Sequence, residues 1–175
     1  MTGGDSGIGR AAAIAFAREG ADVAISYLPE EEPDAKEVIA LIEAEGRKAI
    51  ALIGDIKDEA WCRELVEKTV SGLGGLDILV INAGRQQYRE KIEDLSTDDF
   101  DKTMKTNLYA MFHLCQLAAA HMKPGSAIVN NGSVTALRGS GNLLDYSLTK
   151  GGIHAFTRSL SASLLPRGIR VNCVA

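Results

Sequence analysis

The chain has 175 residues, 46% of them hydrophobic and 24% charged, with a formal net charge of -4. This length and composition predict one globular domain over residues 1–175, and the acidic balance argues against a nucleic-acid partner. No apolar run approaches the ~20 residues of a membrane span and no signal-like segment precedes the first motif, so we expect no membrane partner and a cytoplasmic location. Cys62, Cys115 and Cys173 are scattered, which favours buried reduced thiols and predicts no metal site.

Helical patterns alternate with apolar runs along the whole chain. Helices are predicted at residues 8–19, 34–45, 58–71, 97–122 and 144–165. Strands are predicted at residues 21–27, 48–53, 76–81, 127–129 and 169–174, with an acidic turn at 29–33 and a loop at 130–142. This order and the nearly all-apolar strands predict parallel pairing with helices on both faces. The fold class is therefore α/β, a Rossmann-type doubly wound parallel sheet in three layers.

A glycine-rich segment, Thr2–Gly9, directly precedes the first predicted helix. Glycines at positions 3, 7 and 9 allow the backbone to approach a pyrophosphate, and the helix N-terminus would face the phosphates with free N–H groups and its positive dipole end. Such a motif alone is weak, since a plain loop-to-helix turn would look the same. The alternating strands and helices behind it favour the dinucleotide interpretation.

The choice between NAD and NADP is only weakly encoded. An acidic residue about 20 positions after the loop would bind the ribose 2'-hydroxyl and favour NAD. The predicted strand here ends in Ser26-Tyr27-Leu28, with neither an acid nor an arginine at its tip. Glu30, Glu31 and Glu32 follow and would repel a 2'-phosphate, although they also fit a solvated acidic turn. We therefore predict NAD or NADP, with a slight preference for NAD.

The motifs taken in order resemble the short-chain dehydrogenase/reductase family over essentially the whole chain. The residues that carry this resemblance are Thr2–Gly9, Asp55, Asn82-Ala83-Gly84, Asn107, Ser133, Tyr146 and Lys150. The first segment and Tyr27-Leu28-Pro29 look like the glucose/ribitol dehydrogenase-like subgroup. One departure is Ile81, where the family usually has a further asparagine before Asn82.

The resemblance implies which residues bind the cofactor and which act on the substrate. The cofactor-binding positions are Thr2, Gly3, Ser6, Gly7, Ile8, Gly9, Tyr27, Leu28, Asp55, Ile56, Asn82, Ala83, Gly84, Tyr146 and Lys150. The catalytic positions are Asn107, Ser133, Tyr146 and Lys150. Within the family the lysine also holds the nicotinamide ribose, and the asparagine holds a water that supplies protons.

These catalytic residue types suit the interconversion of an alcohol and a carbonyl. A carbonyl that accepts a hydride becomes an alkoxide and needs a proton. The Tyr146 phenol has an ordinary pKa of about 10, so acid/base work near neutral pH needs a drop of roughly 2 to 3 units. Lys150 lies four residues on, where a helix places its cation beside the phenol. Ser133 follows a strand and would hydrogen-bond the substrate oxygen.

The sequence thus predicts an NAD(P)-dependent oxidoreductase with a small-molecule substrate. A dinucleotide-binding sensor without turnover and an inactive truncated fragment remain as alternatives. The resemblance also implies a strand before the glycine loop and another after the last predicted strand. We therefore expect the chain as written to lack the first, central strand and the last strand, and to be unstable or inactive alone. The full-length parent is expected to be a homo-tetramer that pairs helices 97–122 and 144–165.

Overall fold

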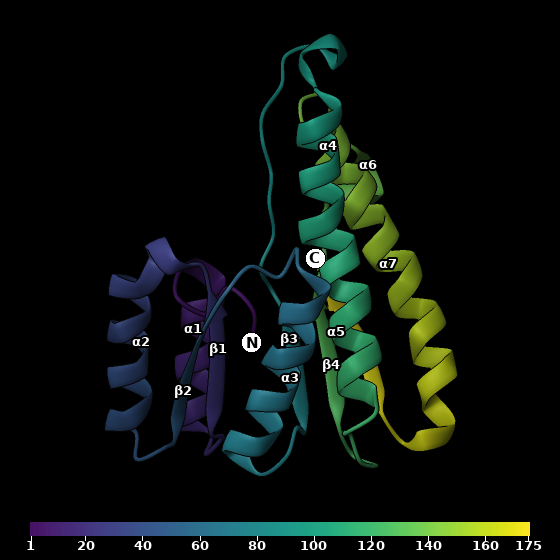
Figure 1. Cartoon of the computed structure of the whole chain (residues 1–175). Helices are drawn as coiled ribbons and strands as arrows, with labels where there is room; N and C mark the ends of the chain where they lie inside the picture. Colours follow the sequence, from purple (N-terminus) through teal and green to yellow (C-terminus); the bar gives the residue numbers. More distant parts are fainter.

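The strands form two parallel sheets that lie side by side (Figure 1). The computed structural model describes all of residues 1–175. One sheet pairs β1 (Val23–Tyr27) with β2 (Ala49–Ile53). The other has the order β3 (Ile78–Ile81), β4 (Ala127–Asn131), β5 (Arg170–Val174). The predicted α/β fold with parallel strands and helices is confirmed.

The two sheets are joined at a single residue. Thr2 forms a parallel bridge to Ser26, next to the last residue of β1, and another to Ile81 at the end of β3. No strand lies between β1 and β3, as expected from the family resemblance. The cavity beside this gap, about 360 Å³, is lined by residues that include Met1, Val23 and Val80.

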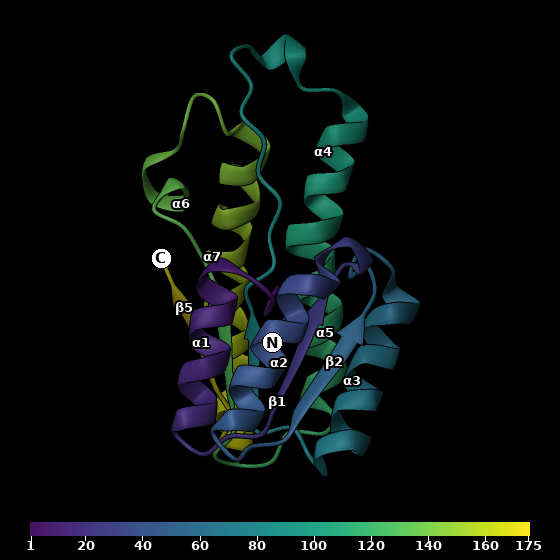
Figure 2. The same ribbon diagram turned by 90° about the vertical axis from the view of Figure 1, so that its left-hand side faces the viewer.

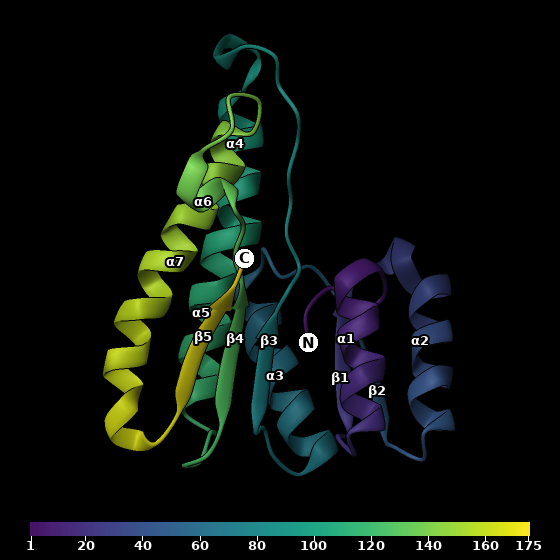
Figure 3. The ribbon, with the colours of Figure 1, turned by 180° about the vertical axis from the view of Figure 1, so that it is seen from behind.

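The helices cover both faces of the sheets (Figures 2 and 3). One face carries α1 (Gly7–Arg18) and α2 (Glu32–Ala44). The other carries α3 (Glu59–Leu73), α5 (Ala110–Ala119) and α7 (Leu144–Leu164). Above the sheets rise α4 (Thr97–Met104), which leads into α5, and the short α6 (Thr135–Arg138) beside α7 (Figure 1). None of these helices combines the length and the hydropathy needed to cross a bilayer.

Two of the helix starts are fixed by capping side chains. The Asp58 carboxylate accepts a hydrogen bond from the Ala60 N–H, and the Ser96 hydroxyl accepts one from the Asp99 N–H. Each bond satisfies one of the amide groups that a helix N-terminus leaves free. Helix α3 then ends at Gly74, whose φ of +82° lies in the left-handed region that glycine tolerates.

Several predicted boundaries are wrong. The long helix predicted over 97–122 is interrupted by a π-helical turn, Lys105–Tyr109, and its last α-helical residue is Ala119. The predicted loop 130–142 contains α6, and β4 extends two residues further, to Asn131, because Asn130 and Asn131 pair with β5. The acidic turn forms a 3₁₀ helix, Pro29–Glu31, directly before α2. Tertiary pairing overrides the low strand propensity of asparagine in β4.

The hydrophobic core has one part on each face of the sheets. Val23, Ile25 and Tyr27 of β1 pack with α1 and α2, whereas Ala24 belongs to the larger cluster under α3, α5 and α7. All five residues of β1 are buried. A strand covered on both faces is expected to be apolar throughout, which explains why its sequence does not alternate. The covered strands all end at one edge, which is where the polar residues gather.

Candidate active site

A cleft of about 810 Å³ lies at the carboxyl ends of β1 to β4. Ligands of open α/β sheets bind at this edge, where the chain switches from one half of the sheet to the other. The residues that line it are Gly3, Asp5, Ser6, Gly7, Ile8, Ser26, Tyr27, Leu28, Glu31, Gly54, Asp55, Ile56, Lys57, Asn82, Ala83, Gly84, Arg85, Gln86, Thr106, Asn131, Tyr146 and Lys150. The cleft therefore brings together residues from both halves of the chain.

The glycine loop has the backbone geometry that a phosphate site needs. Gly3 and Gly7 have φ values of +59° and +51°, which side chains rarely allow. A Cβ atom at Gly9 would lie only 1.8 Å from the Gly3 carbonyl oxygen. The Ser6 side chain does not cap α1, so the amides of the first helical turn are left for a ligand. These features fit a pyrophosphate group.

Two predicted cofactor-binding residues, Thr2 and Gly9, lie behind the cleft and do not line it. The Thr2 hydroxyl accepts hydrogen bonds from the N–H groups of Asn82 and Ala83, both at 3.1 Å. The Asn82 amide donates to the Gly3 carbonyl at 3.0 Å and accepts from Asn131 Nδ2 at 3.0 Å. Thr2 and Asn82 therefore tie the glycine loop to the segment Asn82-Ala83-Gly84, which forms one wall of the cleft.

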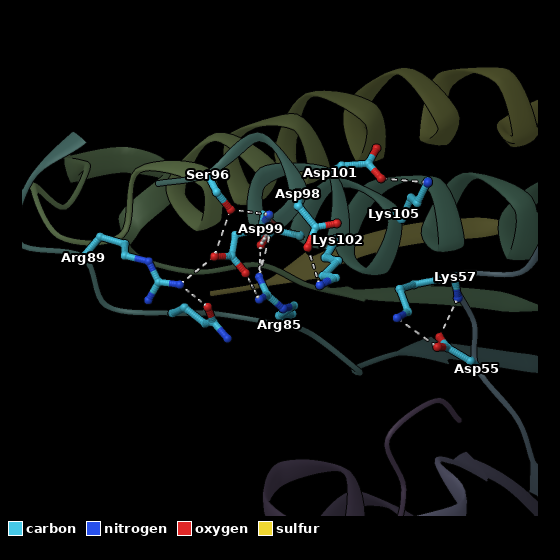
Figure 4. A network of polar contacts seen from close by, with 12 residues as sticks. Asp55, Lys57, Arg85, Arg89, Ser96, Asp98, Asp99, Asp101, Lys102 and Lys105 are labelled. Carbon is cyan, nitrogen blue, oxygen red and sulfur yellow. Dashed lines mark hydrogen bonds and ion pairs between the residues drawn. The ribbon is translucent and has the colours of Figure 1, made fainter. Parts of the chain in front are cut away.

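The far end of the cleft is acidic with one cation. The Tyr27 hydroxyl donates to Glu32 at 2.7 Å, and burial together with this carboxylate raises the pKa of Tyr27 to about 12. Glu31 accepts from the Leu28 N–H at 2.7 Å, while burial raises its pKa. Lys57 pairs with Asp55 at 3.0 Å (Figure 4). This end of the cleft therefore presents both signs of charge.

The opposite end of the cleft holds Tyr146 and Lys150, both on α7. Lys150 Nζ lies 5.4 Å from the centre of the Tyr146 ring and donates to the Asn131 carbonyl at 2.6 Å. Only 3% of Lys150 is exposed, and this burial lowers the pKa of its ammonium. The four-residue spacing on α7 thus places a buried cation beside the phenol, as the sequence predicts.

Asn107 is buried within the π-helical turn and does not line the cleft. Its Oδ1 accepts from the Arg85 N–H at 2.7 Å, and its Nδ2 donates to the Arg85 carbonyl at 2.9 Å and to Thr149 Oγ1 at 3.0 Å. Both amide protons are used. The side chain therefore joins the loop after β3 to α7, a structural role that the sequence does not reveal.

Ser133 also lies outside the lining of the cleft, in the turn before α6. Its Oγ accepts hydrogen bonds from the N–H and the hydroxyl of Thr135, at 3.1 Å and 3.0 Å. A serine hydroxyl can accept two bonds and still donate one, so its proton remains available. Helix α6 packs against α7, which keeps this turn near the helix that carries Tyr146.

Several residues of the cleft escape sequence reasoning. Asp5, Ser26, Lys57 and Thr106 all line it. The position of Lys57, two residues after Asp55, is the one local signal that could have identified it. No cluster of three or more His, Cys, Asp or Glu side chains is placed to hold a metal ion.

Comparison with known proteins reveals close relatives. A family model described as enoyl-(acyl carrier protein) reductase matches residues 3–175. The uncharacterized oxidoreductase YhxD of Bacillus subtilis is 53% identical over all of this chain and 58% of its own length. NADPH-dependent aldehyde reductase 1, chloroplastic, of Arabidopsis thaliana is 41% identical over all of this chain and 62% of its own length. The chain thus spans about 60% of these two relatives' lengths.

A solved structure has the same fold. It is a short chain dehydrogenase from Burkholderia cenocepacia in complex with NADP, with a TM-score of 0.94 and 42% identity. The match covers 98% of this chain and 70% of that one.

Proposed function

Because the chain belongs to the short-chain dehydrogenase/reductase family, we propose that it forms the cofactor-binding and catalytic part of an NAD(P)-dependent oxidoreductase. Its substrate would be a small molecule with an alcohol or carbonyl group. One observation carries the proposal: the glycine loop and the pair Tyr146–Lys150 line one cleft. A phosphate cradle would hold a dinucleotide, and a phenol beside a buried ammonium could exchange a proton with a substrate oxygen.

Each catalytic residue has a role that follows from its contacts. Tyr146 would give a proton to the substrate oxygen during reduction and take it back during oxidation. The Lys150 ammonium would stabilise negative charge that develops on the phenol oxygen during proton transfer. Ser133 would donate its free hydroxyl proton to the substrate oxygen. The nicotinamide, when bound, supplies or accepts the hydride.

Asn107 has a different task. Its Oδ1 and both of its amide protons bond Arg85 and Thr149, so it would hold the loop and α7 in place around Lys150. The family resemblance implies a catalytic role for Asn107, whereas these contacts give its side chain a positioning role.

The cofactor would be NAD or NADP, and the descriptions of two relatives favour NADP. The slight preference for NAD came from the glutamates after β1, of which Glu31 lines the cleft. The Burkholderia relative holds NADP and the Arabidopsis relative is named for NADPH. Lys57 at the same end offers a cation that a 2'-phosphate could meet.

The long helices suggest how copies would assemble. Tyr109 and Phe112 on the helical segment after α4 and Leu148 on α7 are exposed apolar residues, at 51%, 44% and 52%. Large apolar groups on neighbouring helices commonly mark an interface. A homo-tetramer that pairs these helices, working in the cytoplasm, is part of the proposal.

The proposal is tested with the protein as its gene encodes it. Reduced NAD and reduced NADP are each offered with small ketones and aldehydes, and the oxidised forms with sugars and polyols, while nicotinamide absorbance is followed. We expect turnover with at least one substrate. Binding of the nucleotide without any change in absorbance across the panel would instead indicate a sensor.

A further inference from the structure

We propose that Asp99 is a positioning residue, which holds Arg85 and through it fixes Asn107 and the cleft wall against α7. The inference rests on the proposed function for its catalytic meaning, but its structural part stands on contacts alone. Figure 4 shows the network, which lies at the start of α4.

The Asp99 carboxylate is shared between two arginines. Its Oδ1 lies 2.7 Å from Arg85 Nη2 and its Oδ2 lies 2.8 Å from Arg89 Nη2. The Ser96 hydroxyl also donates to Oδ2, at 3.2 Å. The three charged side chains are partly shielded, with exposed fractions of 20%, 27% and 24% for Arg85, Arg89 and Asp99. Such a network orders its members more strongly than an isolated surface pair does.

Arg85 has further anchors on α4. Its Nη1 donates to Thr103 Oγ1 at 2.7 Å and to the Asp99 carbonyl at 3.2 Å. Thr103 is fully buried. The guanidinium fork therefore contacts α4 at three points, a geometry that a lysine could not reproduce.

The main chain of Arg85 is bonded on both sides to one buried amide. Its N–H donates to Asn107 and its carbonyl accepts from Asn107, so the two residues form a closed pair. The other Asn107 proton binds Thr149, whose hydroxyl donates to the Tyr146 carbonyl at 2.7 Å. A continuous chain of hydrogen bonds thus runs from Asp99 to the catalytic tyrosine.

The hydrogen bonds between Asp99 and Tyr146 also fix the wall of the cleft that faces Lys150. Gly84, the residue before Arg85, lines the cleft. A Cβ atom added there would lie 3.6 Å from Asn107 Oδ1 and 3.7 Å from Lys150 Nζ. If the hold on Arg85 loosens, the wall can move relative to Lys150, and small displacements of this kind cost catalysis heavily.

Arg89 offers an internal comparison. It shares the same carboxylate, but its main chain pairs with Asn142 through two hydrogen bonds, at 3.0 Å and 3.2 Å, and makes none with Asn107. Removing the Arg89 side chain should loosen the loop around Arg89 but leave the hydrogen bonds between Arg85 and Asn107 in place.

The test compares Asp99→Asn with Asp98→Asn in the protein as its gene encodes it. Asp98 is the neighbouring residue in the same first helical turn, but it pairs only with Lys102 on the surface. Arg89→Met is the second control and Asp99→Glu the conservative rescue. The readouts are the hydrogen-exchange rate of the Arg85 amide, kcat, the pH profile of kcat and the Kd of reduced NADP.

We expect Asp99→Asn to speed exchange at the Arg85 amide and to lower kcat, each by about tenfold, with a shifted pH profile and Kd within about twofold. Both controls should stay near the parent, and Asp99→Glu should recover part of kcat. Unchanged exchange in Asp99→Asn, or faster exchange with unchanged kcat, overturns the proposal. If the parent protein binds nucleotide without turnover, the proposed function fails, and the exchange rate alone decides whether Asp99 holds the loop.

Discussion

Lys150 Nζ lies 5.4 Å from the centre of the Tyr146 ring, and its one hydrogen bond within the protein goes to the Asn131 carbonyl at 2.6 Å. An ammonium carries three donors, so this buried cation has donors to spare. Burying such a charge lowers the stability of the fold, and buried charges of this kind are found mainly at functional sites.

Lys150→Met should abolish most turnover and yet leave the protein at least as stable at neutral pH. Burial lowers the pKa of Lys150, so the folded state gives up its proton at a lower pH than the unfolded chain. The penalty is therefore present in full below the folded pKa and disappears as the pH rises past the unfolded value of about 10.4.

We expect the free energy of unfolding to rise by about 1 kcal/mol at pH 7 and the gain to shrink toward pH 10, as measured by urea denaturation. Lys68→Met, at an exposed lysine paired with Glu64, serves as the control. A clear loss of stability in Lys150→Met at neutral pH would contradict this account of the buried cation.

Gly9→Ala should damage the phosphate loop, because the new Cβ would lie 1.8 Å from the Gly3 carbonyl oxygen. A backbone atom cannot yield as a flexible side chain can, so we expect a loss of about 1 to 3 kcal/mol in unfolding free energy. Nucleotide affinity should fall as well, by fluorescence titration. Gly75→Ala, which meets open space, is the matched control. Equal behaviour of the two variants would show that the loop tolerates a side chain.

The sequence predicts best what depends on neighbours along the chain. Tyr146 and Lys150 are four positions apart on one helix, so their juxtaposition follows from helical geometry. The glycine loop likewise lies directly before its helix. The order of strands and helices then places the cleft at the carboxyl edge, and all of this could be predicted before any coordinates.

What could not be predicted depends on contacts across the fold. Arg85 meets Asn107 over 22 positions and Asp99 over 14 positions, and no pattern in the sequence encodes these pairs. The π-helical turn, Lys105–Tyr109, interrupts a helix whose apolar spacing reads as regular. Asn107 therefore looks like a catalytic side chain in the sequence, whereas its amide is consumed by the loop and by Thr149.

Trp61 should report cofactor binding by energy transfer. It is the single tryptophan of the chain and packs against Gly54, which lines the cleft. A Cβ atom at Gly54 would lie 2.3 Å from the indole. Exciting Trp61 in the presence of a reduced nicotinamide cofactor should therefore give nicotinamide emission. Trp61→Phe should lose this signal while still binding, as measured by direct nicotinamide fluorescence. Binding to the parent without transfer would place the cofactor elsewhere.

The Asp99 network should weaken in acid. Arg89 and Arg85 hold the pKa of Asp99 below its usual range. The stability that Asp99 contributes is therefore complete above the ordinary carboxyl pKa of about 3.9 and is lost as the pH falls through the lower, folded value. The gap in denaturation midpoint between the parent and Asp99→Asn should be clear at pH 7 and should narrow progressively as the pH falls below about 3.9. A gap that stays constant with pH would mean that the carboxylate charge is not what stabilises this network.

The central claim is tested most directly by turnover and nucleotide affinity of Tyr146→Phe, measured side by side in the protein as its gene encodes it. The variant keeps the ring beside Lys150 and removes only the hydroxyl group that would exchange the proton. We predict a Kd for the reduced cofactor within about twofold of the parent and a loss of at least about a hundredfold in kcat. Near-normal turnover in Tyr146→Phe would contradict the assignment of this phenol as the acid.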